Sequence, residues 1–108
     1  MGKHKIEKIE EFSDILQSNK KFILIKHSLT CPISKAAFDE YEQFVSENED
    51  IPTFYLYVQE ARPLSNYIAE TFSIKHESPQ ALLFEDGKVT WDTSHRNITK
   101  ESLRNAGV

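Results

Sequence analysis

The sequence predicts an α/β fold in which a four-stranded mixed sheet is flanked by helices. In some stretches apolar residues recur at three- and four-residue steps, which indicates amphipathic helices. Other stretches are short, apolar and rich in β-branched or aromatic residues, which indicates strands. The two kinds alternate along most of the chain, and such alternation is typical of parallel strands joined by right-handed helical crossovers.

The predicted elements follow one another in the order αβαβαββα. We expect helices over about 6–18 and 32–48, a third opened by Pro63, and a last one capped by Thr99 and ended before Gly107. The predicted strands cover 22–25, 53–58, 80–84 and 88–93. The run Phe22–Ile25 is apolar without alternation, as in a central strand buried on both faces. Asp86-Gly87 is a two-residue hairpin signal, so the last two strands are expected to be antiparallel.

Length, composition and charge narrow the class of protein. At 108 residues the chain is expected to form one domain, spanning 1–108. Apolar residues make up 39% and charged residues 28%, as in ordinary globular proteins. The net charge of −4 predicts no general attraction to nucleic acid or anionic membranes, and no apolar run is long enough to cross a bilayer. The single cysteine cannot form an internal disulfide, so we expect a cytoplasmic protein, and a monomer.

Cys31 is the strongest candidate for a reactive residue. It follows an apolar strand and starts a predicted helix in Thr30-Cys31-Pro32-Ile33-Ser34. The first N–H groups of a helix lack internal partners, and with the helix dipole they favour a thiolate. The alternative is a buried cysteine that packs as a small hydrophobe. Pro32 and the preceding polar residues favour the reactive thiol, which we expect to be supported by Thr30, Pro32 and Ile33.

Ser34 stands three residues after Cys31, where dithiol redox motifs have their second cysteine. A resolving thiol is therefore absent from the motif. Ser34 could donate a hydrogen bond to the Cys31 thiolate and support its charge, or it could bond locally to the backbone; the sequence leaves both open. Chemistry at Cys31 would be one-cysteine exchange, in which an outside thiol resolves a mixed disulfide.

Lys26 and His27 precede Cys31 at the end of the predicted strand. Strand alternation sends their side chains to opposite faces, so we expect only one of them to approach the sulfur. A cation there would lower the thiol pKa. For Lys26 a solvated strand end is the favoured interpretation, whereas for His27 a packed ring and a thiolate partner are equally open. No metal site is predicted, because one cysteine is too few and ligand spacing is absent among the four histidines: His4, His27, His76 and His95.

The element order, the Cys-x-x-Ser and the proline of Ser78-Pro79 before the penultimate strand resemble a thioredoxin-like domain with an added N-terminal helix. More narrowly, the chain resembles the YtxJ-type (BrxC) monothiol bacilliredoxins over nearly its whole length. The matching motifs are Lys26-His27-Ser28, Thr30-Cys31-Pro32-Ile33-Ser34, Ser78-Pro79 and the Asp86-Gly87 hairpin. The resemblance implies a thiol-disulfide oxidoreductase in thiol redox control that takes bacillithiol from S-bacillithiolated proteins. Bacillithiol would be its co-substrate, with no bound cofactor.

The resemblance also implies roles for individual residues. Cys31 would be the attacking thiolate, and Ser34 would fill the position of the missing resolving cysteine. Pro79 would be cis, and the backbone of Ser78 would pair with the incoming substrate as an added strand. Bacillithiol carries a malate group, so a nearby cation would help to hold it. The candidates by sequence position are Lys35, Lys75 and His76.

The dithiol of thioredoxins is absent, and Ile25 stands where thioredoxins carry a buried acid, six residues before the nucleophile, so dithiol reduction by the thioredoxin route is not expected. A second class of function stays open. The same cleft could be a non-catalytic binding module in which Ser78-Pro79 docks an extended peptide, with Cys31 as a bystander or a redox sensor. A thiol pKa well below the free value of about 8.5 would favour the enzyme, and an unshifted pKa the binding module.

Overall fold

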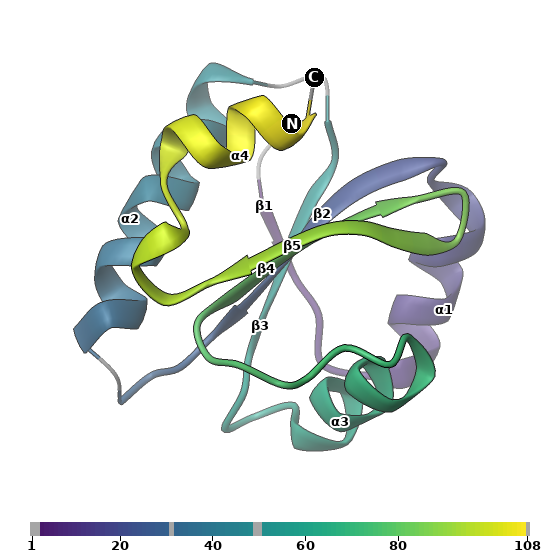
Figure 1. Ribbon diagram of the computed structural model, residues 1–108. Coiled ribbons are helices and arrows are strands. Elements are labelled where there is room, and N and C mark those ends of the chain that lie inside the picture. The colour runs from purple at the N-terminus through teal and green to yellow at the C-terminus, as the bar shows by residue number, and fades with distance from the viewer. Residues whose placement is uncertain (1–2, 31, 49–50, 108) are drawn as a thin grey trace.

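The computed structural model describes residues 3–30, 32–48 and 51–107. Its strands are β1 (Lys3–Lys5), β2 (Lys21–His27), β3 (Thr53–Tyr57), β4 (Gln80–Glu85) and β5 (Lys88–Ser94). Its helices are α1 (Ile9–Ser18), α2 (Pro32–Glu47), α3 (Arg62–Thr71) and α4 (Lys100–Gly107), with a short 3₁₀ turn, η1 (His95–Asn97), before α4. The strands form one mixed sheet in the order β1-β3-β2-β4-β5. Helices α1 and α3 lie on one side of the sheet and α2 and α4 on the other (Figure 1).

Strand β2 lies at the centre of the sheet and divides the core in two. It pairs in parallel with β3 and antiparallel with β4, and Ile23, Leu24 and Ile25 have no exposed surface. Alternate side chains contribute to separate apolar clusters: Phe22 and Leu24 on the α1/α3 side, Ile23 and Ile25 on the α2/α4 side. The prediction of a strand buried on both faces is confirmed.

The beginning of the chain differs from the prediction. The sheet has five strands rather than four, because residues Lys3–Lys5 pair in parallel with β3 at its edge. The first helix starts at Ile9 and not at residue 6. Ile6 is only 4% exposed and its N–H donates to the carbonyl of Tyr55 at 2.9 Å, so this residue extends the edge pairing. Three polar residues in a row give no strand signal, and only the tertiary pairing with β3 defines β1.

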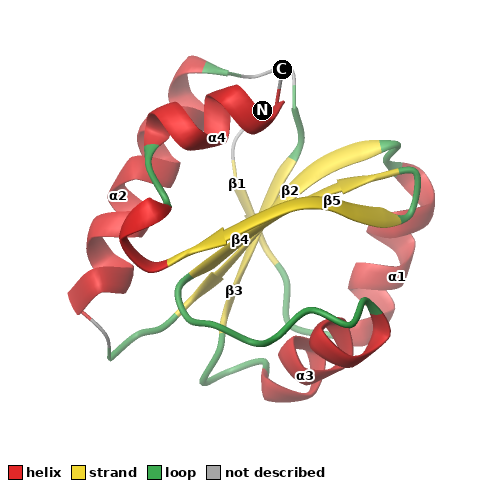
Figure 2. Ribbon diagram, in the orientation of Figure 1, coloured by secondary structure: helices red, strands yellow, loops and turns green. Residues whose placement is uncertain are grey.

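The end of the chain follows the prediction closely. Asp86 and Gly87 both have positive φ, 52° and 77°, as the hairpin turn between β4 and β5 requires. Thr99 caps α4, since its Oγ1 accepts the N–H of Ser102 at 3.0 Å. The helix continues through Gly107 rather than ending before it. Figure 2 shows the resulting order, with helices on both sides of the central strands.

Candidate active site

The site lies at the end of the sheet formed by the last residues of β2 and the first residues of β4. These strands are antiparallel and pair Lys26 with Gln80, so the turn after β2 and the loop before β4 meet at that end. The turn ends at Thr30, and α2 begins at Pro32. The predicted strand-to-helix junction is therefore confirmed on both sides of Cys31. Cys31 itself lies outside the described residues, so the state of its thiol stays a prediction.

The loop before β4 carries a cis peptide bond between Ser78 and Pro79, as the sequence resemblance implied. Pro79 is buried, and its carbonyl accepts the backbone N–H of His95 at 3.0 Å. The Oγ of Ser78 is buried without a hydrogen-bond partner among the described residues. Such an orphaned polar atom is uncommon in folded proteins. Backbone pairing of Ser78 with a substrate stays a prediction.

Ser34 holds the turn after β2 from the first turns of α2. Its side chain is fully buried, and its Oγ accepts the backbone N–H of Ser28 at 3.2 Å. This contact corresponds to the backbone-bonding alternative left open by the sequence. The additional hydrogen bond from Ser34 to a Cys31 thiolate stays a prediction. Whatever its role at the sulfur, Ser34 ties the start of α2 to the end of β2.

Gln59, just after β3, braces the same turn from the other side. Its Oε1 accepts the N–H of Leu29 at 3.1 Å, and its Nε2 donates to Ser28 Oγ at 2.9 Å and to Thr30 Oγ1 at 3.3 Å. The hydroxyls of Ser28 and Thr30 lie 3.4 Å apart. Thr30, a predicted supporting residue, is thus fixed by this amide. Sequence reasoning missed Gln59, because a glutamine after a strand carries no signal of its own.

The expectation of a solvated Lys26 is wrong. Lys26 is 1% exposed and lies on the α1/α3 side of the sheet, where its Nζ donates to the carbonyl of Ser65 at 3.1 Å. Burial lowers its pKa from the usual 10.5 to about 8, because desolvation disfavours the ammonium. The strand places this cation inside the protein rather than at a wet edge.

His76, which is itself exposed, contacts the buried residues Lys26 and Ser65, and we call these three residues the Lys26 cluster. The Nδ1 of His76 lies 3.3 Å from Lys26 Nζ and 3.3 Å from Ser65 Oγ. A Lys26 ammonium can only donate, so its contact with Nδ1 assigns the ring proton of His76 to Nε2 and leaves the ring neutral. Burial, and next the charge of Lys26, lower the His76 pKa. Binding of the substrate by His76 stays a prediction, and a neutral ring would not supply the cation that was expected there.

His27 occupies the opposite face of β2. Its ring centroid lies 4.6 Å from that of Phe38 on α2 and 5.4 Å from that of Tyr57 on β3. Burial lowers the pKa of His27, and the backbone of Ser34 acts in the opposite direction. The surroundings correspond to the packed alternative, and the role of His27 as a thiolate partner stays a prediction.

An open hollow of about 340 Å³ lies against the first turns of α2, and we call it the α2 hollow. Its lining is Pro32, Ile33, Ala36 and Arg96. A neighbouring hollow of about 240 Å³ shares the last three of these and continues to Glu40, His95 and Thr99. Of the cations predicted to hold malate, Lys35 lines neither hollow, and Lys75 is 88% exposed and lies 3.7 Å from Glu77. Arg96 was not predicted.

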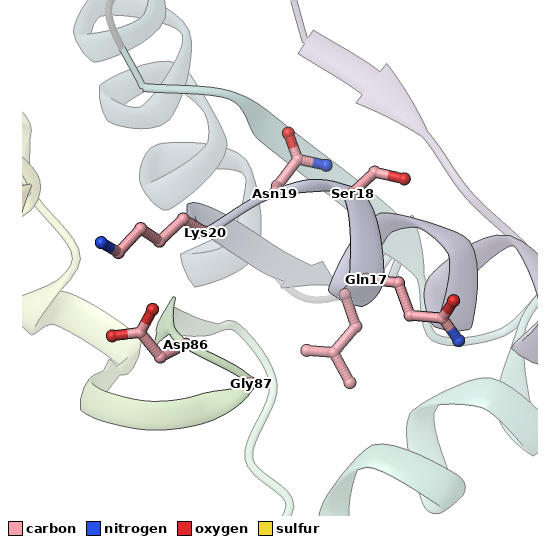
Figure 3. A pocket seen from close by; sticks show the side chains of 7 residues that line it. Gln17, Ser18, Asn19, Lys20, Asp86 and Gly87 are labelled. Carbon is pink, nitrogen blue, oxygen red and sulfur yellow. The ribbon is translucent and has the colours of Figure 1, made fainter.

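Another hollow, of about 570 Å³, lies at the opposite end of the sheet, between the end of α1 and the β4–β5 turn. There the N–H of Asp86 donates to the carbonyl of Lys20 at 2.8 Å. The labelled side chains spread apart instead of converging on one centre (Figure 3). Converging polar groups are the usual mark of a ligand site, so volume alone does not make this hollow a candidate.

The cis-proline loop, the strand-to-helix junction and the helix-flanked mixed sheet define a thioredoxin-fold protein. Solved structures agree: mitochondrial thioredoxin 3 from Saccharomyces cerevisiae matches at 16% identity and a TM-score of 0.77, covering 96% of this chain and 92% of that one. A Fasciola hepatica thioredoxin matches at 14% identity and a TM-score of 0.78, covering 95% and 94%. At such low identity these two matches show the shared fold alone.

Closer matches identify the family. Residues 4–103 match the family described as monothiol bacilliredoxin BrxC. A solved structure described as "A putative oxidoreductase with a thioredoxin fold" is 41% identical, with a TM-score of 0.90, covering 96% of this chain and 92% of that one. The chain belongs to the BrxC family. In the described part of the chain, no helix has the length and apolar character needed to span a membrane.

Proposed function

We propose that this protein is a monothiol bacilliredoxin that removes bacillithiol from protein mixed disulfides in the cytoplasm. The supporting observation is the meeting of three elements at one end of the sheet, in a chain of the BrxC family. These are the end of β2, the start of α2 and the cis Ser78–Pro79 bond. Cys31 lies in sequence between the first two. This arrangement supports a reaction in which the Cys31 thiol acts next to the loop that contains Pro79.

The reaction has two exchange steps. In the first, the Cys31 thiolate attacks the bacillithiol sulfur of a protein–S–S–bacillithiol bond. A Cys31–bacillithiol disulfide forms, the old disulfide breaks, and the electron pair leaves with the protein as its thiolate. In the second, the thiolate of another bacillithiol attacks the adduct, releasing bacillithiol disulfide and restoring the Cys31 thiolate. Ser34 has no sulfur with which to divert the adduct into an internal disulfide.

The test is transfer from a defined substrate protein that carries one S-bacillithiolated cysteine. Intact mass spectrometry follows the substrate and the bacilliredoxin together. We expect the substrate to lose bacillithiol and the bacilliredoxin to gain it, on Cys31 alone, and added bacillithiol to clear the adduct. Because Ser attacks disulfides far more slowly than a thiolate, Cys31→Ser should abolish transfer. Transfer by the Cys31→Ser protein at the wild-type rate would refute the mechanism.

A further inference from the structure

The α2 hollow combines apolar residues with one cation at the start of α2, the helix that follows Cys31 in the sequence. Its lining starts at Pro32, the residue after Cys31, and continues one helical turn to Ala36. Arg96 closes it from η1. The turn is tied to the cis-proline loop by the bond from His95 N–H to Pro79 O, 3.0 Å. A group attached to Cys31 could therefore extend into this hollow.

Charge distinguishes the α2 hollow from its neighbour. Among the described residues that line it, Arg96 is the one with a charge, and none is a carboxylate. Glu40 lines the neighbouring hollow instead, where its Oε1 accepts the N–H of Lys100 at 2.8 Å. Glu77 lies 3.6 Å from Nε2 of His95 and 3.7 Å from Lys75. An anion would therefore meet an arginine in the α2 hollow without a carboxylate lining the same space.

We infer that Arg96 binds the malate carboxylates of bacillithiol while the sulfur of bacillithiol is joined to Cys31, with Ile33 and Ala36 as the floor beneath the sugar. This inference rests on the proposed function. The planar guanidinium presents paired N–H donors that match a carboxylate. The cations expected from sequence are worse placed, since Lys35 and Lys75 do not line the hollow and Nδ1 of His76 faces Lys26.

The experiment compares two mixed disulfides of the same substrate protein. One carries bacillithiol, and the other carries cysteinyl-glucosamine, which is bacillithiol without its malate. Transfer rates are measured for the wild type, Arg96→Gln and two matched variants. Arg104→Gln removes the same charge from an exposed position on α4, and Lys35→Gln removes the charge of an exposed lysine on α2. For each variant we compare the ratio of the two transfer rates, bacillithiol over analogue. A general effect of the variant on folding or on Cys31 changes both rates alike and cancels in this ratio.

We expect Arg96→Gln to raise KM for the bacillithiol substrate about tenfold, the range of one charge-assisted contact. Its kcat and its rate with the malate-free substrate should stay near wild type. Arg104→Gln and Lys35→Gln should keep the wild-type preference. Unchanged preference in Arg96→Gln, or an equal loss in Lys35→Gln, would overturn the inference while wild-type transfer still supported the proposed function. Absence of wild-type transfer from both substrates would instead refute the function and the inference with it.

Discussion

Lys26 and His27 are neighbours on β2, yet their side chains have opposite surroundings. On the α1/α3 side, Lys26 is 1% exposed and contacts polar groups of Ser65 and His76. On the α2/α4 side, His27 packs between the rings of Phe38 and Tyr57. The polar contacts fix a histidine three residues before Pro79, in the loop with the cis bond. The aromatic contacts join β2 to α2, the helix that follows Cys31.

Each face of β2 therefore positions one element of the candidate site, the loop with Pro79 or helix α2, and each does so with different chemistry. The Lys26 cluster depends on charge and on directed donors, so the support that it gives to the loop varies with pH. The packing around Phe38 depends on shape and apolar burial, which vary little with pH once the His27 ring is neutral. Substitutions on the two faces should consequently differ in size and in pH dependence.

The largest expected difference concerns stability. Phe12 is 1% exposed, and its ring lies 5.5–6.4 Å from those of Phe22, Tyr67, Phe72 and Phe84. Phe12→Ala should lower the free energy of unfolding by about 3–5 kcal/mol, since it empties a closed aromatic site. Phe38→Ala, at a partly buried position on the other face, should cost roughly 1–2 kcal/mol. Urea unfolding measures both losses. Equal losses would contradict the expected difference between the buried cluster around Phe12 and the partly exposed one around Phe38.

The next effect is a pH dependence above about pH 8 that we expect from Lys26, on the α1/α3 side of the sheet. The pKa of Lys26 is about 8 in the folded protein, against 10.5 for an ordinary lysine. Between these values the unfolded chain binds a proton that the folded chain lacks, so stability rises with pH, by up to about 1.4 kcal/mol per unit. Lys26→Met should remove this rise. Burial of Tyr41 raises the pKa of its phenol, which acts in the opposite direction only above about pH 10.

Urea unfolding between about pH 8 and pH 10 tests this expectation. Lys75→Met is the matched control, because Lys75 is 88% exposed and should leave the slope unchanged. The lowered pKa of His27 acts in a separate, acidic window: as pH falls below about 6.5, the unfolded chain takes up the proton first and stability is lost. A slope in Lys26→Met equal to that of the wild type above pH 8 would mean that the buried cation is not its source.

The smallest effect is expected at the turn after β2, residues 28–30, which Gln59 contacts. Gln59→Leu removes the acceptor for Leu29 N–H and the donor to Ser28 and Thr30. Because these contacts are partly exposed, we expect a loss of about 1 kcal/mol in unfolding free energy. The amide of Leu29 should exchange with solvent faster, as NMR hydrogen exchange would detect. Unchanged protection of that amide would show that Gln59 does not hold the turn.

The sequence predicted the central parts of the fold better than its edges. Phe22–Ile25 was predicted as a strand buried on both faces because all four of its residues are apolar. Asp86-Gly87 and Thr99 were predicted correctly because a hairpin turn and a helix cap depend on local residue types. Strand β1 has no such signal, since it exists through pairing with β3. Its polar residues could be assigned only once the sheet was known.

The site divides in the same way. The junction around Cys31 and the cis Ser78–Pro79 bond follow from local motifs and from the family resemblance. The burial of Lys26 depends on Ser65 and His76, which lie 39 and 50 residues away in the chain. Gln59 and Arg96 likewise reach the site through tertiary contacts, so their positions could not be predicted from neighbouring residues.

The most direct measurement is the rate of alkylation of the native protein as a function of pH. Cys31 is the only cysteine, so the reaction reports on that thiol alone, and mass spectrometry can confirm a single adduct. Because Cys31 directly precedes the first residue of α2 in the chain, we predict an apparent thiol pKa well below the free value of about 8.5. An apparent pKa at or above that value, or a thiol that fails to react in the native state, would contradict the account.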